Sequence, residues 1–305
     1  MKVSALSPRE FAQRLADGEL LIDIHPFVTR LRSRVPRLTR ELALMYAEFP
    51  LLPPDSFADF HIEIRLEGLL RRWLRPQARF IYDGKPAFLP LPADHALTMV
   101  EWGLNWCVAS HAHQFLVIHA AVLERGGMAI VLPAPPGSGK STLCAALMLR
   151  GWRLLSDELA LFDMASGLVH GMARPVNLKN ASIGVIRAFE PAAVFSEEIP
   201  DTAKGTVALL RAPAEAVARR KEPARPRWVV LPAYQAGAAT ALLRMDRAES
   251  MMLMAEQSFN YDIHGRRGFD ALTDLCAGAD CYRFEYSRLD EGIAAIDALA
   301  TEAGA

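Results

Sequence analysis

One eight-residue stretch, residues 134–141, constrains this chain more than any other feature. It reads Ala-Pro-Pro-Gly-Ser-Gly-Lys-Ser and lies between an apolar, strand-like run at 128–133 and a helix-like run. A phosphate-binding loop (Walker A motif) requires this order, because the helix that follows the loop points its first N–H groups at the anion. Gly137 and Gly139 let the backbone wrap closely around phosphate oxygens. The stretch predicts nucleotide binding; the alternative is a Gly-rich surface turn that happens to precede a lysine.

The loop residues have separate expected tasks. Lys140 is expected to face solvent and to neutralise the β and γ phosphates of ATP, while the Ser141 hydroxyl ligates Mg²⁺. Ala134 replaces the first glycine of the motif, which a negative φ accommodates. The predicted nucleotide-binding residues are Ala134, Pro135, Pro136, Gly137, Ser138, Gly139, Lys140, Ser141 and Thr142.

Three further side chains could act beside this loop. Asp157 and Glu158 follow a short apolar run, and carboxylates at a strand end beside Mg-ATP can hold the metal or accept a proton from a hydroxyl. The alternative is a solvated turn between two strands. His119 interrupts the otherwise apolar run at 115–124, and taken alone it is more often a packed core residue.

Composition excludes several other classes of protein. Of 305 residues, 51% are hydrophobic and 23% are charged, which is enough to form a substantial core and excludes a disordered tail. A net charge of -1 argues against a general nucleic-acid binder. The apolar runs are too short for a membrane span, and the N-terminal stretch lacks the apolar core of a signal peptide.

The four scattered cysteines do not form a disulfide framework. Cys276 and Cys281 could be half of a metal site, but the second pair that zinc needs is missing. Reduced thiols and a cytoplasmic location are therefore expected.

The pattern of hydrophobic, polar and turn-forming residues along the chain predicts an α/β protein. We expect a smaller α+β domain at 1–92, with helices over 8–17 and 36–49, a strand over 57–67 and an extended piece over 71–84. Prolines near residue 90 suggest a boundary, and 93–305 would form a second domain that carries the loop. Within it, 211–227 resembles a surface loop or mobile segment, and 281–299 a strand followed by an amphipathic helix.

Taken together, the histidine on a strand, the phosphate loop and the acidic pair resemble the catalytic domain of bacterial HPr serine kinase/phosphorylase. His119 precedes Ser141 by 22 residues and Asp157 follows it by 16, spacings that agree with that family. The branch called HprK-related kinase A is more similar still, and the likeness extends over nearly the whole chain. It is carried by the runs HPFVTRLRS, EWGLNWC, IHAAVLER, PPGSGKSTLCAAL, RGWRLLSDELAL, RPVNLKNASI, KGTVALL and QSFNY.

The resemblance implies a P-loop kinase domain of the HPr kinase/PEP carboxykinase-like type. It also implies an ATP- and Mg²⁺-dependent enzyme that phosphorylates a hydroxyl, expected to be a serine, of a peptide or protein in a peptide-modification gene cluster. His119 would lie beside the γ-phosphate, and Lys140 would act on the phosphates. Asp157, with Ser141, would face the metal and also the acceptor, and Glu158 stands where the family has a second Asp.

Other positions carry expectations from the same resemblance. Lys179 stands where the parent family has a further acidic metal ligand, which predicts that phosphorolysis is lost; Lys179 or Arg174 could bind phosphate instead. Lys204 and Gly205 belong either to a loop over the site or to a surface turn. Asn260 and Tyr261 either line the site or cap a helix.

Two other functions stay open from the sequence: a small-molecule kinase on the same fold, and a non-enzymatic, ATP-gated module that binds a partner. A peptide or protein substrate is the expected partner, with neither nucleic acid nor membrane. The parent family is oligomeric, which leaves a homo-oligomer open. The sequence does not identify the phosphoryl acceptor.

Overall fold

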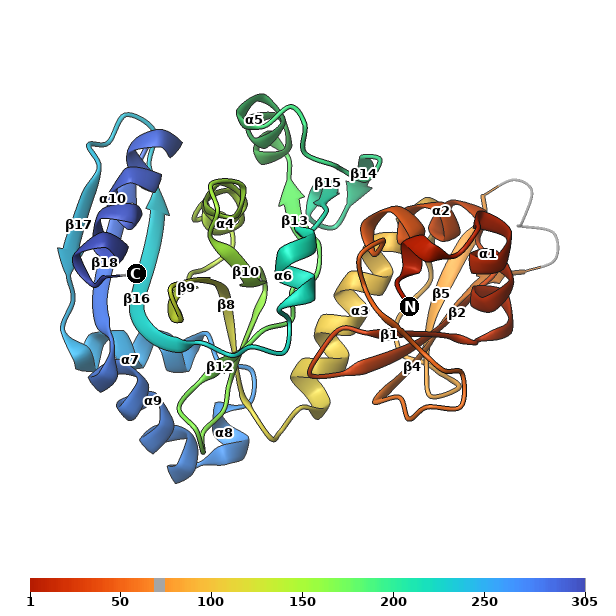
Figure 1. Cartoon of the computed structure of the whole chain (residues 1–305), viewed down its shortest axis with the longest axis horizontal. Coiled ribbons are helices and arrows are strands. Elements are labelled where there is room, and N and C mark those ends of the chain that lie inside the picture. Colours follow the sequence, from red (N-terminus) through yellow and green to blue (C-terminus); the bar gives the residue numbers. More distant parts are fainter. Residues whose placement is uncertain (69–74, 305) are drawn as a thin grey trace.

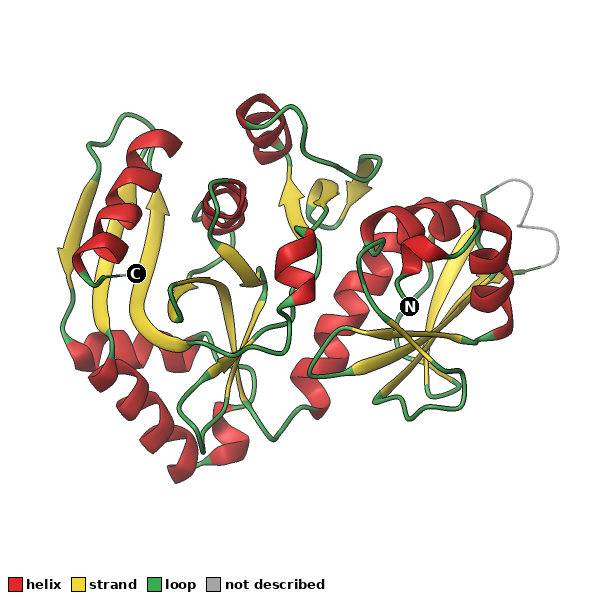
Figure 2. Cartoon of the chain, viewed as in Figure 1, coloured by secondary structure: helices red, strands yellow, loops and turns green. Residues whose placement is uncertain are grey.

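A computed structural model describes residues 1–68 and 75–304 as an α/β protein with mixed sheets. The N-terminal elements lie at one end of an elongated molecule and the C-terminal elements at the other, with the strand 128–133 and the helix 140–149 that flank the loop between them (Figure 1). Helices lie over the sheets throughout (Figure 2). The α/β class predicted from the sequence is confirmed.

The N-terminal sheet has strand order β3-β1-β2-β4-β5-β6, with β7 also paired to β5. Its strands are β1 (Leu20–Asp23), β2 (Val28–Ser33), β3 (Leu51–Leu52), β4 (Phe60–Glu67), β5 (Gln77–Tyr82), β6 (Lys85–Pro86) and β7 (Leu91–Pro92). The accompanying helices are η1 (Val3–Ala5), α1 (Pro8–Asp17), α2 (Pro36–Met45) and η2 (Ala93–His95). The expected extended piece over 71–84 is β5 where it is described, and residues 71–74 lie outside the described residues.

Local sequence signals set these elements. The Ser7 side chain accepts from the Glu10 backbone N–H while Glu10 accepts from the Ser7 backbone, and Gly18 ends α1 in the left-handed conformation. In β4, Phe60, Ile62 and Ile64 are buried at alternate positions, as the pattern predicted. These features confirm the predicted first helix and strand.

Helix α3 (Ala96–His111) follows the proposed boundary and packs against β5, with Gly103 facing the ring of Phe80. One continuous core joins this helix, the N-terminal sheet and the helix that follows the phosphate loop. The division of the chain at residues 92 and 93 stays a prediction.

The second sheet has the order β12-β11-β8-β9-β16-β18-β17, with β10 also paired to β8. Its strands are β8 (Leu116–Arg125), β9 (Met128–Pro133), β10 (Arg153–Ser156), β11 (Leu159–Phe162), β12 (Val169–His170), β16 (Arg225–Tyr234), β17 (Ala241–Arg244) and β18 (Asp280–Tyr286). Strands β9, β16 and β18 run parallel, whereas β8 runs antiparallel to β9 and β11 antiparallel to β8. The carboxyl ends of the parallel strands therefore meet at one edge of the sheet.

Helices cover both faces of this sheet. Helices α4 (Lys140–Leu149) and α10 (Leu289–Glu302) pack together on one face, and α7 (Arg247–Glu256), α8 (Tyr261–His264) and α9 (Arg266–Gly278) belong to the other. A third sheet has the order β13 (Val176–Lys179), β15 (Gly205–Leu210), β14 (Ile199–Thr202), and is followed by α6 (Ala214–Ala218). Helix α5 (Ala181–Phe189) packs against α4 and β13.

The interpretation of 211–227 as a surface loop or mobile segment is wrong. The segment forms α6 and the start of β16, and Ala216 and Val217 are buried. Arg220 forms an ion pair at 2.5 Å with Asp23 of the N-terminal sheet. The Ala- and Pro-rich composition resembled a linker, but small side chains also permit close packing against the core.

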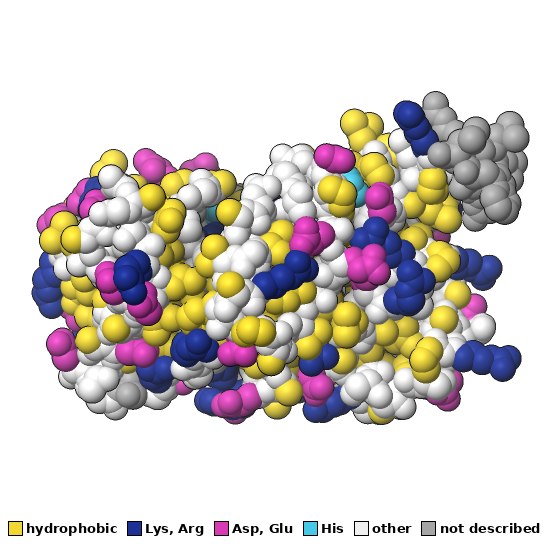
Figure 3. Space-filling model, turned by 90° about the horizontal axis from the view of Figure 1, so that it is seen from above, with side chains coloured by type: hydrophobic (Ala, Val, Ile, Leu, Met, Phe, Trp, Pro, Cys, Tyr) yellow, Lys and Arg dark blue, Asp and Glu magenta, His cyan; other side chains and the backbone are white. Residues whose placement is uncertain are grey.

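No helix in the described ranges is long and apolar enough to cross a membrane. On the face seen in Figure 3, basic and acidic side chains are interspersed among apolar ones. This view matches a chain with a net charge of -1.

Candidate functional site

The phosphate-loop sequence lies between β9 and α4, so the predicted order of strand, loop and helix is confirmed. Gly137 and Gly139 have φ values of +90° and +86°, a region that side chains with a Cβ rarely adopt. The first N–H groups of α4 have no partner within the helix and point toward the loop. Lys140 is only 6% exposed, so the expectation that it faces solvent is wrong.

Strand register brings the other predicted residues to this loop. In β8, Ala120 pairs with Pro133, the last residue of β9, and the neighbouring His119 pairs with Leu159 at the start of β11. Strands β10 and β11 both lie along β8, and Asp157 and Glu158 form the bend between them. Residues separated by tens of positions therefore meet at one end of the sheet.

The side chains form a connected row. The Nε2 atom of His119 lies 2.9 Å from the Nζ atom of Lys140 and 3.2 Å from Oε2 of Glu158. Lys179, from β13, extends the row, with its Nζ 3.8 Å from Oε1 of Glu158. His119 is thus a site residue and not only a packed core residue.

Asp157 lies deeper than Glu158 and is 4% exposed. Its Oδ2 accepts from the backbone N–H of Asn177 at 3.0 Å, while its buried Oδ1 has no hydrogen-bond partner among the described residues. Burial raises the pKa of the Cys144 thiol, and the carboxylate of Asp157 beside it adds to the shift. Asp157 is therefore a neighbour of Cys144 in α4, which shares one side of that helix with Ser141, three residues earlier.

Burial and neighbouring charges shift the pKa values of the row. Desolvation lowers the pKa of Lys140, although the carboxylates of Glu158 and Asp157 oppose the shift. Desolvation and the charge of Glu158 raise the pKa of Asp157. Burial alone would also raise the pKa of Glu158, but its hydrogen bond with His119 and the charges of Lys140 and Lys179 together lower it. Glu158 is thus held as the anion of the pair.

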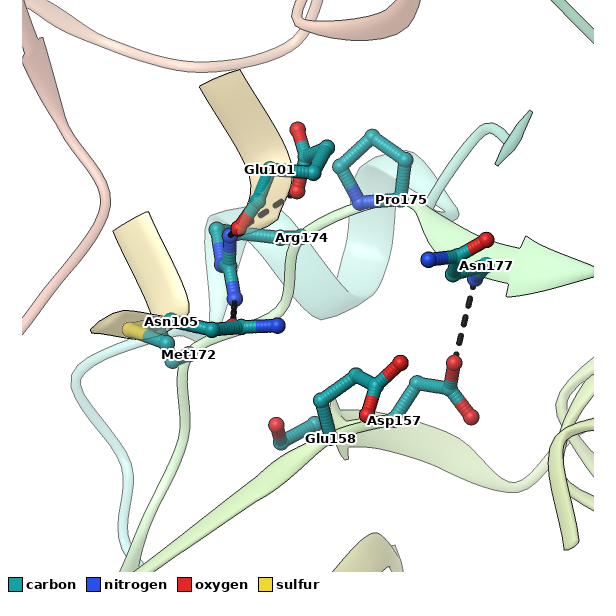
Figure 4. Close-up of a pocket in the computed structure, with 9 residues that line it drawn as sticks. Glu101, Asn105, Asp157, Glu158, Met172, Arg174, Pro175 and Asn177 are labelled. Carbon is teal, nitrogen blue, oxygen red and sulfur yellow. Dashed lines mark hydrogen bonds and ion pairs between the residues drawn. The ribbon is translucent and has the colours of Figure 1, made fainter. Parts of the chain in front are cut away.

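A cavity of about 10 Å³, enough for about one water molecule, adjoins the acidic pair. Figure 4 shows the Asp157 side chain directed toward Asn177, whereas Glu158 contacts none of the residues drawn there by a hydrogen bond or ion pair. Across the cavity, Arg174 donates to Oε2 of Glu101 at 2.8 Å and to the side chain of Asn105. Arg174 is paired inside the protein, so the structure offers no support for the expectation that it binds phosphate.

The donor set fits magnesium better than zinc. Within residues 1–68 and 75–304, no group of three or more His, Cys, Asp or Glu side chains is arranged to hold a metal. Mg²⁺ is usually bound by one or two carboxylates together with water and substrate phosphates. The buried Oδ1 of Asp157, which has no hydrogen-bond partner among the described residues, would supply one such carboxylate ligand.

Lys204 lies at the far end of the row. Its Nζ is 4.9 Å from the ring centroid of Trp102 in α3, and desolvation together with the charge of Lys179 lowers its pKa. The Asn180 side chain accepts from the Thr206 backbone N–H, beside the turn at 203–204 that contains Lys204. Sequence reasoning did not single out Trp102 or Glu101 individually, although both belong to the EWGLNWC run that carries the resemblance.

Asn260 occupies the N-cap position of α8, the helix-end alternative, but its side chain makes no capping hydrogen bond there. Its amide donates to the carbonyl of Phe115 and accepts from the N–H of Val117, so it fixes the start of β8. Arg266 is an exposed side chain.

No protein-family model matches this chain, and no curated protein matches it either. Fold and site together define an α/β protein with a glycine-containing loop beside buried charged groups. Its function has to be argued from that site.

Proposed function

We propose that the protein is an ATP-dependent kinase that transfers the γ-phosphoryl group to a hydroxyl, with a peptide or protein serine as the favoured acceptor. The observation that carries the proposal is the row from Lys140 through His119 to Glu158, at the carboxyl end of β9. The resemblance to HprK-related kinase A and to the P-loop kinase domain of HPr kinase supports the same reading.

The charges suit phosphoryl transfer. The N-terminus of α4 and Lys140 would bind the phosphates, which need neutralisation as the terminal group departs. Ser141 and Asp157 would hold Mg²⁺, which would supply further charge neutralisation there.

Glu158 is suited to position the acceptor hydroxyl and to take its proton. In the structure, the charges of Lys140 and Lys179 help to hold the pKa of Glu158 low, which makes it a weak base. Phosphate oxygens that engage Lys140 would weaken this effect and raise the basicity of Glu158. The acceptor would therefore be activated mainly when nucleotide is bound. The sequence led us to expect that Asp157 faces the acceptor. The proposal assigns that role to Glu158 instead.

The direct test incubates the protein with γ-labelled ATP, Mg²⁺ and the short peptides encoded by genes beside its own, with mass spectrometry to find an added phosphate. A phosphorylated peptide that is absent with Glu158→Gln supports the proposal. Label transferred only to small hydroxyl metabolites would indicate a small-molecule kinase. Nucleotide binding without transfer to any acceptor would favour an ATP-gated binding module, and no ATP binding would reject all three readings.

A further inference from the structure

Two tyrosines flank the phosphate loop on the side away from the acidic pair. Tyr234 ends β16 and Tyr286 ends β18, and the two residues are paired in register. Their rings meet edge to face with centroids 5.8 Å apart. Strand β16 is the parallel neighbour of β9, so these rings lie at the sheet edge where the loop begins.

Both tyrosines are fixed to the loop by hydrogen bonds. The backbone N–H of Tyr234 donates to the Ser138 carbonyl at 2.9 Å, and the hydroxyl of Tyr286 donates to the Gly139 carbonyl at 3.1 Å. A Cβ at Gly139 would come within 2.8 Å of the Cβ of Tyr234 and 2.6 Å of the Tyr286 hydroxyl. The loop therefore packs directly against the backbone of Tyr234 and the ring of Tyr286.

The two rings differ in exposure. Tyr286 is 1% exposed and is part of the core, whereas Tyr234 is 53% exposed although it touches the loop. A tyrosine side chain has only two χ angles, so an exposed ring beside the loop loses little conformational entropy when a flat ligand covers it.

The direction of a bound nucleotide follows from the arrangement of the strands. His119 and Glu158 lie on the β8 and β11 side of the loop, so the phosphate that reacts must lie on that side. The rest of the nucleotide then extends toward β16, where Tyr234 lies.

We propose that Tyr234 is the stacking platform for the purine base of the nucleotide. The inference rests on the proposed function, because it presupposes a nucleoside triphosphate in the loop. Since every base has a π face, stacking alone gives affinity with little discrimination between adenine and guanine.

The test compares ATP with inorganic tripolyphosphate, which has the phosphates but no base, by calorimetry on the full chain with Mg²⁺. Tyr234→Ala is expected to weaken ATP binding by about 5- to 150-fold, the range for loss of one stacked base, and to leave tripolyphosphate binding unchanged. Tyr234→Phe keeps the ring and should retain parental ATP affinity. Phe269→Ala, which removes a similarly exposed ring from α9, is the matched control and should leave the affinity for both ligands unchanged.

The possible outcomes separate this inference from the proposed function. Equal ATP affinity in Tyr234→Ala and the parent overturns the stacking role while leaving a nucleotide site in place. Equal weakening of ATP and tripolyphosphate binding in Tyr234→Ala also overturns the stacking role, because the substitution would then have disturbed the loop. If the parent chain binds neither ligand, the proposed function fails together with the inference.

Discussion

The Nε2 atom of His119 lies 2.9 Å from the Nζ atom of Lys140, and this contact joins β8 to the first residue of α4. The same Nε2 atom lies 3.2 Å from Oε2 of Glu158, so His119 contacts both the lysine and the carboxylate. His119 thus connects the buried lysine of the loop to the acidic pair.

Lys140→Met is expected to weaken ATP binding by about 10- to 150-fold, because hydrogen bonds to charged groups contribute about 1.5–3 kcal/mol. The fold should survive, since Met fills the same buried space without the desolvation that lowers the pKa of Lys140. Calorimetric titration with Mg-ATP measures the affinity. Lys85→Met, at an exposed position in β6, is the control. Unchanged affinity in Lys140→Met would rule out its contact with phosphate.

The two carboxylates are expected to respond differently to neutral isosteres. Glu158→Gln should lower the rate of phosphoryl transfer by about 10²–10⁴-fold while ATP still binds, because it removes the proposed base. Asp157→Asn should raise the Mg²⁺ concentration needed for half-maximal activity. Initial rates over a Mg²⁺ series measure both effects. The roles of metal ligand and base would be reversed if Glu158→Gln raised the Mg²⁺ requirement. In that case Asp157→Asn would lower only the rate of phosphoryl transfer.

Gly103→Ala should destabilise the protein by about 1–3 kcal/mol, the usual cost of overpacking a core. The new methyl group would lie 2.0 Å from Cε2 of Phe80, where α3 crosses β5. Gly184→Ala is the matched control, because it lies on exposed α5 with nothing within 4 Å of the added carbon. Urea unfolding of both variants measures the difference. Equal stability of the two variants would show that α3 does not pack closely on the sheet.

Stability should fall on acidification because of His25 and His170, whose ring centroids are 6.4 Å apart. Burial lowers the pKa of both residues, and Asp23 and Asp163 only partly oppose it. The unfolded chain, with histidine pKa values of about 6.5, then binds more protons than the folded chain. The contribution of these residues is complete above about pH 6.5 and is lost as the pH falls through their folded pKa values.

Urea unfolding at about pH 7.5 and about pH 5.5 tests this dependence. The double variant His25→Gln/His170→Gln should lose less stability between the two conditions than the parent does. His61→Gln, at an exposed position of β4, should behave as the parent. An undiminished loss in the double variant would assign the acid sensitivity to other groups.

Local signals were enough to predict much of the secondary structure. The capping box at Ser7 and Glu10, the alternation from Phe60 to Ile64, and the glycines before Lys140 each act through the backbone of a few neighbouring residues. The segment around α6 was misread because composition alone does not show what a residue packs against.

The sequence by itself determined the loop and identified His119, Asp157 and Glu158 as candidates, because residue type and spacing along the chain express these features. Only the tertiary structure decided which of them touch. Strand register sets His119 opposite Leu159, next to Glu158, and the packing of α4 buries Lys140 against them. The tertiary structure also places Tyr234 beside the loop. Parallel pairing of β9 and β16 brings together residues about a hundred positions apart. Such pairings depend on the whole core and leave no local signal in the sequence.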